Sequence, residues 1–159
     1  MESVKQLLLV PVDFSPVTSA VVREATDLAR ALCARLCLLH AIVTDLDYVE
    51  YDRGPVVGRA AVMAELKRSQ GSLQALASKV EAEGVEVTTL VTPGAAVDAI
   101  LGEARRQQAR MIVMGSHGHG ILHAVFAGSV SQGVLRRADC PITFVPSRKA
   151  AAASATSPG

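Results

Sequence analysis

Short apolar blocks alternate with longer amphipathic segments along this chain. Residues 7–12 (LLLVPV) are almost continuously apolar, which is typical of a strand buried on both faces of a parallel sheet. Further short blocks of this kind predict strands at residues 35–41, 85–91, 111–114 and 141–145. None of the blocks approaches the roughly 18–20 apolar residues that a membrane-spanning helix needs, so no membrane segment is predicted.

Helical periodicity fills the segments between the predicted strands. After the first strand, Ser15 offers a capping side chain and Pro16 suits the first helical position, and apolar residues then recur every three or four positions up to Leu32. The same periodicity predicts helices at residues 57–83, 96–104 and 129–137. Strands that alternate with helices predict an α/β fold with a parallel sheet and right-handed crossovers.

Length and composition narrow the class of protein. The 159 residues correspond to one domain, predicted over residues 1–146, and the Ala-, Ser- and Pro-containing tail at 147–159 is expected to be disordered. A net charge of +1 and 3% aromatic residues argue against a nucleic-acid partner. The N-terminus lacks the features of a signal peptide.

The cysteines point to a reducing environment. Cys33, Cys37 and Cys140 are odd in number, and a domain of this size does not need disulfides. We therefore expect a cytoplasmic protein in which these residues are reduced thiols that serve as small buried apolar side chains.

Candidate chemistry follows the predicted strands, because ligands bind beyond the carboxyl ends of parallel strands. Asp13 comes directly after the first strand, and His40 and Ala41 end the second. The segment after the fourth strand carries glycine at positions 115, 118, 120 and 128 and leads to a helix that begins at Ser129. Glycines let backbone N–H groups approach an anion, and a helix N-terminus adds free donors and a positive dipole end.

This segment is predicted to hold phosphate groups, the alternative being a loop whose glycines only make turns. It matches neither the dinucleotide fingerprint, since a third glycine is missing after Gly118-His119-Gly120, nor the P-loop, since no lysine follows. Histidines are its only titratable residues. We therefore predict binding with at most slow hydrolysis and assign no catalytic residue; an enzyme that uses the histidines on a phosphorylated substrate is the least favoured reading.

The spacing Gly115-x2-Gly118-x9-Gly128-Ser129 resembles the G-2x-G-9x-G-[ST] nucleotide-binding motif of the universal stress protein family. The segments at 11–15 (PVDFS), 38–40 (LLH) and 134–141 (VLRRADCP) are similar to other landmarks of that family. The resemblance covers residues 4 to 146. It implies a Rossmann-like three-layer fold with a five-stranded parallel sheet of order 3-2-1-4-5, and a stress-response or regulatory protein that binds ATP. Mg²⁺ is expected with the ATP because it commonly accompanies phosphates.

The resemblance also implies a role for each matching residue. The phosphates would be held by Gly115, Gly118, Gly128 and Ser129, with an amide contributed by Val130. Asp13 would contact the nucleoside, and Val12 and Ala41 would line the adenine pocket.

Two residue types keep alternatives open. The family pattern does not require His117, His119 and His123; contacts of His117 and His119 with phosphate are favoured over a metal site, because the glycines oppose the helix that would align imidazoles. Asp13 could reach Mg²⁺ through water or cap the first helix. We expect a ligand contact.

The last predicted strand suggests self-association. Ile142, Phe144 and Val145 lie in an uncharged strand at the sheet edge, and such an edge invites pairing with another chain. A homodimer through this strand is expected on these grounds, and the resemblance implies it too. The alternative to nucleotide sensing is a dimeric interaction module with a vestigial nucleotide site.

Overall fold

The computed structural model describes residues 5–42, 55–116 and 129–147. Its sheet has five strands in the order β3-β2-β1-β4-β5, and each neighbouring pair is parallel. The strands are β1 (Leu7–Pro11), β2 (Arg35–Ile42), β3 (Val87–Pro93), β4 (Met111–Gly115) and β5 (Ile142–Val145). The predicted α/β fold and strand order are therefore confirmed. Because the chain builds outward from β1 in one direction and from β4 in the other, the order reverses between these two strands.

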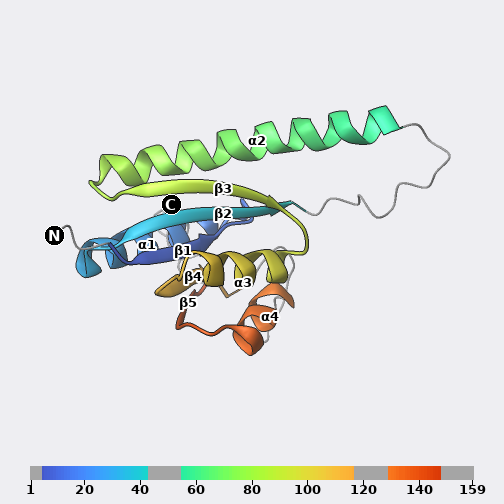
Figure 1. Cartoon of the computed structure of the whole chain (residues 1–159). Coiled ribbons are helices and arrows are strands. Elements are labelled where there is room, and N and C mark those ends of the chain that lie inside the picture. The colour runs from blue at the N-terminus through green and yellow to red at the C-terminus, as the bar shows by residue number, and fades with distance from the viewer. Residues whose placement is uncertain (1–4, 43–54, 117–128, 148–159) are drawn as a thin grey trace, which may run out of the picture.

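Helices cover both faces of the sheet (Figure 1). They are α1 (Thr18–Leu32), α2 (Pro55–Ala82), α3 (Ala96–Arg106) and α4 (Ser129–Arg137). Helices α1 and α2 pack on one face and α3 and α4 on the other, which gives three layers. Among the described residues, no helix has both the length and the apolar character needed to cross a bilayer.

The two faces have separate apolar cores. Leu8 and Val10 of β1 point to the side of α1 and α2, whereas Leu7 and Leu9 point to the side of α3 and α4. All four side chains are at most 2% exposed. Since successive residues of a strand face opposite sides, both sets must be apolar, and this explains the continuous apolar run in the sequence.

Strand β3 begins later than the sequence predicts. The chain leaves α2 through Gly84, at φ +80°, and Val85 N–H still bonds to the helix carbonyl of Val80 at 3.4 Å. Val85 is buried against α2 and lies before the strand pairing, which starts with Val87 opposite Leu36. The apolar character of Val85 thus reflects helix packing rather than strand pairing.

The predicted start of α1 is wrong. The helix begins at Thr18, its cap position is Val17, and no side chain caps it. Ser15 instead contributes its backbone: its N–H donates to Asp13 Oδ1 at 3.0 Å and its carbonyl accepts from Thr18 N–H at 3.0 Å. The turn after β1 uses these hydrogen bonds, so neither Ser15 nor Pro16 has its expected place in the helix.

The cysteines fit the sequence prediction in part. All three are free. Cys37 is a buried residue of β2 that packs in the core, and burial raises the pKa of its thiol. Cys33 is exposed, which contradicts the expectation of burial, because it ends α1 in the left-handed conformation at φ 52°.

Helices α3 and α4 meet at Gly133, and this contact yields a prediction. A Cβ atom at Gly133 would lie 2.7 Å from Val97 Cγ2 and 3.2 Å from Cγ1, so the Val97 side chain or helix α4 would have to shift. We expect Gly133→Ala to lower the free energy of unfolding by about 1–3 kcal/mol in urea denaturation, as overpacking does. The gain in helix propensity, at most about 1 kcal/mol, is too small to offset this loss.

Gly102→Ala is the matched control. Gly102 is an exposed residue of α3, and a Cβ there meets nothing within 4 Å, so the same substitution should stabilise by up to about 1 kcal/mol. Adding Val97→Ala to Gly133→Ala should recover part of the loss. Equal effects of the two glycine substitutions would contradict close helix packing at Gly133.

Candidate functional site

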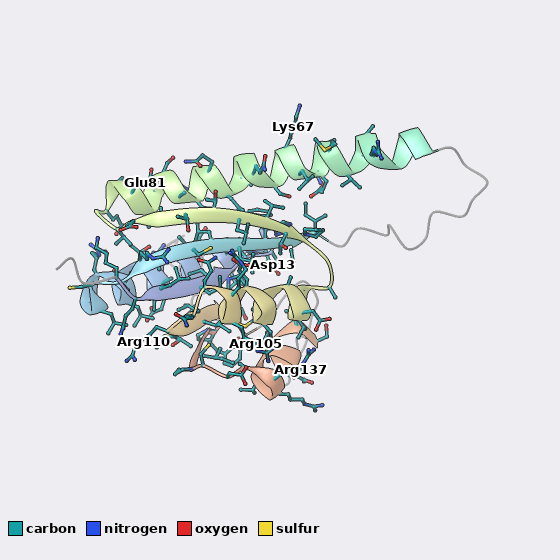
Figure 2. The ribbon with its side chains drawn as sticks, in the orientation of Figure 1. Asp13, Lys67, Glu81, Arg105, Arg110 and Arg137 are labelled. Atoms are coloured by element: carbon teal, nitrogen blue, oxygen red, sulfur yellow. The ribbon has the colours of Figure 1, made fainter. Side chains whose placement is uncertain are left out.

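The candidate site lies at the carboxyl ends of the two central strands β1 and β4. These strands pair side by side, with Leu8 opposite Met111 and Leu9 opposite Ile112. Beyond them the chain leaves β1 for α1 on one face of the sheet, whereas α4 follows on the other face. Ligands of open parallel sheets bind at such a reversal of strand order. Asp13 therefore follows β1 at the edge where Gly115 ends β4 (Figure 2).

The turn after β1 holds Asp13 in a defined position. Asp13 is exposed, and its Oδ1 accepts the N–H of Ser15 at 3.0 Å in an Asx-type turn. Phe14, between them, has φ 58°, a left-handed conformation that bulky residues rarely adopt. The residue remains 37% exposed. Strain of this kind concentrates at functional sites.

His40 links the ends of β1 and β2. Its Nδ1 lies 2.8 Å from the carbonyl oxygen of Val12. A carbonyl only accepts hydrogen bonds, so Nδ1 carries the proton and donates. The imidazole also contacts the ring of Phe14, with ring centroids 4.5 Å apart and planes tilted by 40°. The sequence marked His40 as a strand-end residue, but it gave no sign of this role.

The β4 side of the edge is formed by the first turn of α4. Ser131 Oγ donates to the carbonyl of Gly115 at 3.1 Å and is buried, so it ties the helix to the end of the strand. Val130 packs into the apolar core beside α3, whereas Ser129 is exposed. The helix starts at Ser129, as predicted. The N-terminus of α4, the positive end of its dipole, therefore lies close to Gly115.

The predicted site residues fall into three groups. Val12 is buried, Ala41 is half-buried and Asp13 is exposed, and all belong to the ends of β1 and β2. Gly115, Ser129 and Val130 belong to the end of β4 and the start of α4. The remaining predicted residues lie outside the described part of the chain: Gly118, Gly128, His117, His119 and His123.

Metal-binding side chains are sparse in what the structure describes. Within residues 5–42, 55–116 and 129–147, no group of three or more His, Cys, Asp or Glu side chains could hold an ion. A cation at Asp13 would therefore depend on water or on the ligand for its other bonds, and the predicted contact through water stays a prediction.

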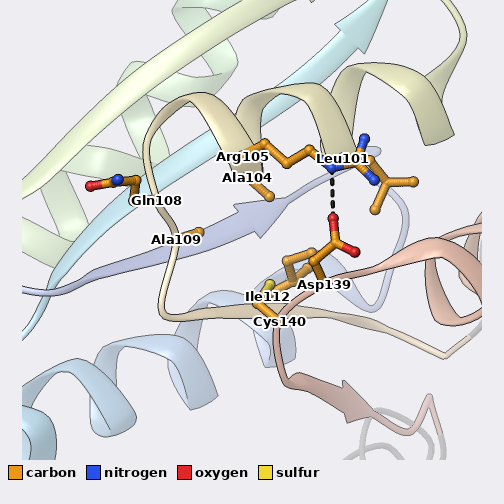
Figure 3. A pocket seen from close by; sticks show the side chains of 8 residues that line it. All are labelled: Leu101, Ala104, Arg105, Gln108, Ala109, Ile112, Asp139 and Cys140. Atoms are coloured by element: carbon orange, nitrogen blue, oxygen red, sulfur yellow. Dashed lines mark hydrogen bonds and ion pairs between the residues drawn. The ribbon is translucent and has the colours of Figure 1, made fainter.

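A pocket of about 180 Å³ lies at the amino ends of β4 and β5, away from the candidate site (Figure 3). Arg105 Nε donates to Asp139 Oδ2 at 2.7 Å beside it, and Cys140 lines it. Burial raises the pKa of the Cys140 thiol, so the sulfur stays protonated at neutral pH and is a poor nucleophile. This pocket is smaller than typical ligand sites, and the paired arginine leaves little charge to attract an anion.

An open sheet with this strand order and polar residues at its reversal point defines a Rossmann-like α/β protein. The family model for the universal stress protein family matches residues 6–146, and the chain belongs to this family.

Individual relatives cover most of the chain. A universal stress protein of Thermus aquaticus is 33% identical over 123 residues, which are 74% of this chain and 81% of that protein. One from Methanocaldococcus jannaschii is 25% identical over 150 residues, which are 93% of this chain and 86% of the relative.

Solved structures share the fold. UspA from Lactobacillus plantarum has a TM-score of 0.75 at 23% identity, covering 91% of this chain and 99% of its own. A universal stress protein in complex with cAMP has a TM-score of 0.64 at 23% identity, with 90% and 98% covered. One from Archaeoglobus fulgidus in complex with dAMP has a TM-score of 0.66 at 19% identity, with 89% and 98% covered.

Two buried hydroxyls at the start of α1 give a prediction. Ser15 Oγ and Thr18 Oγ1 are buried and, within the described structure, have no hydrogen-bond partner. An unsatisfied buried hydroxyl costs free energy, whereas an apolar group of the same shape does not. Thr18→Val should therefore raise the free energy of unfolding by about 1 kcal/mol in urea denaturation.

Thr26→Val is the matched control in the same helix. Thr26 is also buried, but its Oγ1 donates to the Val22 carbonyl at 2.7 Å. Losing this bond should lower stability by about 1 kcal/mol, so the two substitutions should have opposite signs. A loss of stability in both variants would show that Thr18 has a partner in solution.

Proposed function

We propose that this universal stress protein binds an adenine nucleotide, ATP in particular, at the carboxyl ends of β1 and β4. One observation carries the proposal: the start of α4 is bonded to the end of β4, and β4 pairs with β1. Backbone donors and a helix dipole at this place suit an anion, and the neighbouring turn suits a nucleoside. Relatives of the same fold in complex with cAMP and dAMP support an adenine ligand.

In this proposal, the end of β4 with the start of α4 holds the phosphates, and the ends of β1 and β2 hold the nucleoside. The phosphates would lie against Gly115, Ser129 and the amide of Val130, together with Gly118 and Gly128 of the sequence motif. His117 and His119 would contact phosphate as well. On the other side, Asp13 would face the nucleoside and, through water, a Mg²⁺ ion bound to the phosphates; Val12 and Ala41 would line the adenine pocket.

We infer a regulatory role rather than rapid catalysis. Histidines are the only titratable residues between Gly115 and Gly128, and no lysine is present there to stabilise charge on a transferred phosphoryl group. The output would be a change of conformation or partner in a stress response, with at most slow hydrolysis. Three free thiols support a cytoplasmic location.

A homodimer through β5 is part of the proposal. This strand forms one edge of the sheet, and its sequence, ITFV, carries no charge. Exposed apolar edges pair readily with a second copy, whereas proteins that avoid pairing place charges there. If the nucleotide site proved to be vestigial, this dimer would remain as an interaction module.

Calorimetric titration with ATP and Mg²⁺ tests the nucleotide site. The nucleotide-stripped protein should bind about one ATP per chain, with little phosphate released over hours. Gly118→Val and Gly128→Val should abolish binding without changing the free energy of unfolding, because their side chains would occupy phosphate positions. Gly71→Val is the control, since Gly71 lies on α2 with open space around it. Absence of binding to the unsubstituted protein at millimolar ATP would leave only the interaction module.

Light scattering tests the dimer. We expect Ile142→Lys to halve the molar mass, because a charged side chain on an edge strand opposes pairing. Thr89→Lys is the control on β3, the strand at the other edge of the sheet, and should leave the mass unchanged. A monomeric unsubstituted protein at micromolar concentration would contradict the proposed dimer.

A further inference from the structure

The last peptide group of β4 lies between the proposed ligand and β5. It joins Gly115 to Ser116, and its N–H donates to the carbonyl of Val145 in β5 at 3.1 Å. In a trans peptide the N–H and the C=O point to opposite sides. Since β4 lies between β5 and β1, the Gly115 carbonyl points to the side of β1, where the nucleotide is proposed to lie.

The orientation and charge of this peptide matter for an anionic ligand. A carbonyl oxygen carries partial negative charge and only accepts hydrogen bonds, so it repels phosphate oxygens. Gly115 has a wide range of backbone angles, so its own conformation does little to hold the peptide in one orientation. Phosphate binding beside Gly115 therefore requires that another group holds this peptide and offsets the charge of its oxygen.

Ser131 supplies that group. Its Oγ donates to the Gly115 carbonyl at 3.1 Å, and the residue is 2% exposed. The N–H of the same peptide is bonded to β5 and its C=O to α4, so two bonds on opposite sides fix its orientation. The hydroxyl proton also offsets part of the negative charge of the oxygen.

Other contacts hold α4 in place without the Ser131 hydroxyl. Val130 and Val134 lie in the apolar core on the side of α3, and Val134 is fully buried. Gly133 packs closely against Val97 of α3. Removal of the hydroxyl should therefore leave the helix where it is, and its effect should be confined to the peptide between Gly115 and Ser116.

We propose that Ser131 is a positioning residue for the phosphates, which fixes the last peptide of β4 and binds the carbonyl that would otherwise oppose them. The inference rests on the proposed function, because it adds one residue to the same site. Ser131 acts through Gly115 and need not touch the ligand. It should therefore affect the affinity for phosphate groups and not the affinity for the nucleoside.

Ser131→Ala tests this role by calorimetric titration and by amide hydrogen exchange. The Kd for ATP should rise about tenfold, the equivalent of one lost hydrogen bond of ordinary strength. The Kd for adenosine, which carries no phosphate, should stay within about twofold. In the ligand-free variant the Ser116 amide should exchange at least about fivefold faster, because one of the two bonds that fix its peptide is gone.

Two further variants separate positioning from general damage. Ser131→Thr keeps a hydroxyl on the same carbon, so the Kd for ATP should stay within about threefold and Ser116 exchange should stay slow. Ser69→Ala is the matched control, since Ser69 is also 2% exposed but donates to Glu65 Oε1 at 3.2 Å within α2. It should change neither readout. Equal losses of affinity for ATP and adenosine in Ser131→Ala would overturn the inference, as would unchanged Ser116 exchange.

The fixed peptide can also be observed without any substitution, in case Ser131→Ala fails to fold. The Ser116 amide of the unsubstituted, ligand-free protein should be protected from exchange, and rapid exchange would overturn the inference. If the unsubstituted protein binds no ATP, the proposed function fails, and the exchange results still decide whether Ser131 holds the peptide. If it binds ATP and Ser131→Ala binds ATP equally well, the inference alone fails.

Discussion

After β1 and β4 the chain turns to opposite faces of the sheet, and the rest of the site depends on this constraint. These strands pair at Leu8–Met111 and Leu9–Ile112, yet the helices that follow lie on opposite faces of the sheet. Peptide groups beyond the last pair must therefore find other partners or remain available to a ligand. The Val12 carbonyl finds His40, and the Gly115 carbonyl finds Ser131.

Some energetic costs lie at the same ends of the strands. Phe14 has a strained backbone, and the hydroxyls of Ser15 and Thr18 are buried without partners in the described structure. The burial of apolar side chains in the sheet, with Leu8, Leu9 and Leu36 fully buried, offsets these costs.

Apolar patterning predicted the fold well, because buried parallel strands and amphipathic helices leave distinct periods in the sequence. The spacing from Gly115 to Ser129 likewise located the start of α4. The sequence predictions failed where a side chain forms a hydrogen bond with the backbone. Ser15 looked like a helix cap, but Asp13 takes its N–H and the chain turns at Phe14. The roles predicted for the other motif residues remain predictions.

His40 shows the limit most clearly. Its partner is a backbone carbonyl 28 residues away, and a carbonyl leaves no trace in the residue type that carries it.

The pairing of β4 with β5 links the two parts of the proposed function, the nucleotide site and the homodimer. Gly115 pairs with Val145 of β5, and Ser116 N–H bonds to the Val145 carbonyl at 3.1 Å. A nucleotide held at Gly115 would thus lie on the strand that pairs with β5, the proposed dimer edge. Since a ligand shifts a conformational equilibrium only through different contacts in its two states, the β4–β5 end is where nucleotide occupancy and association can be coupled.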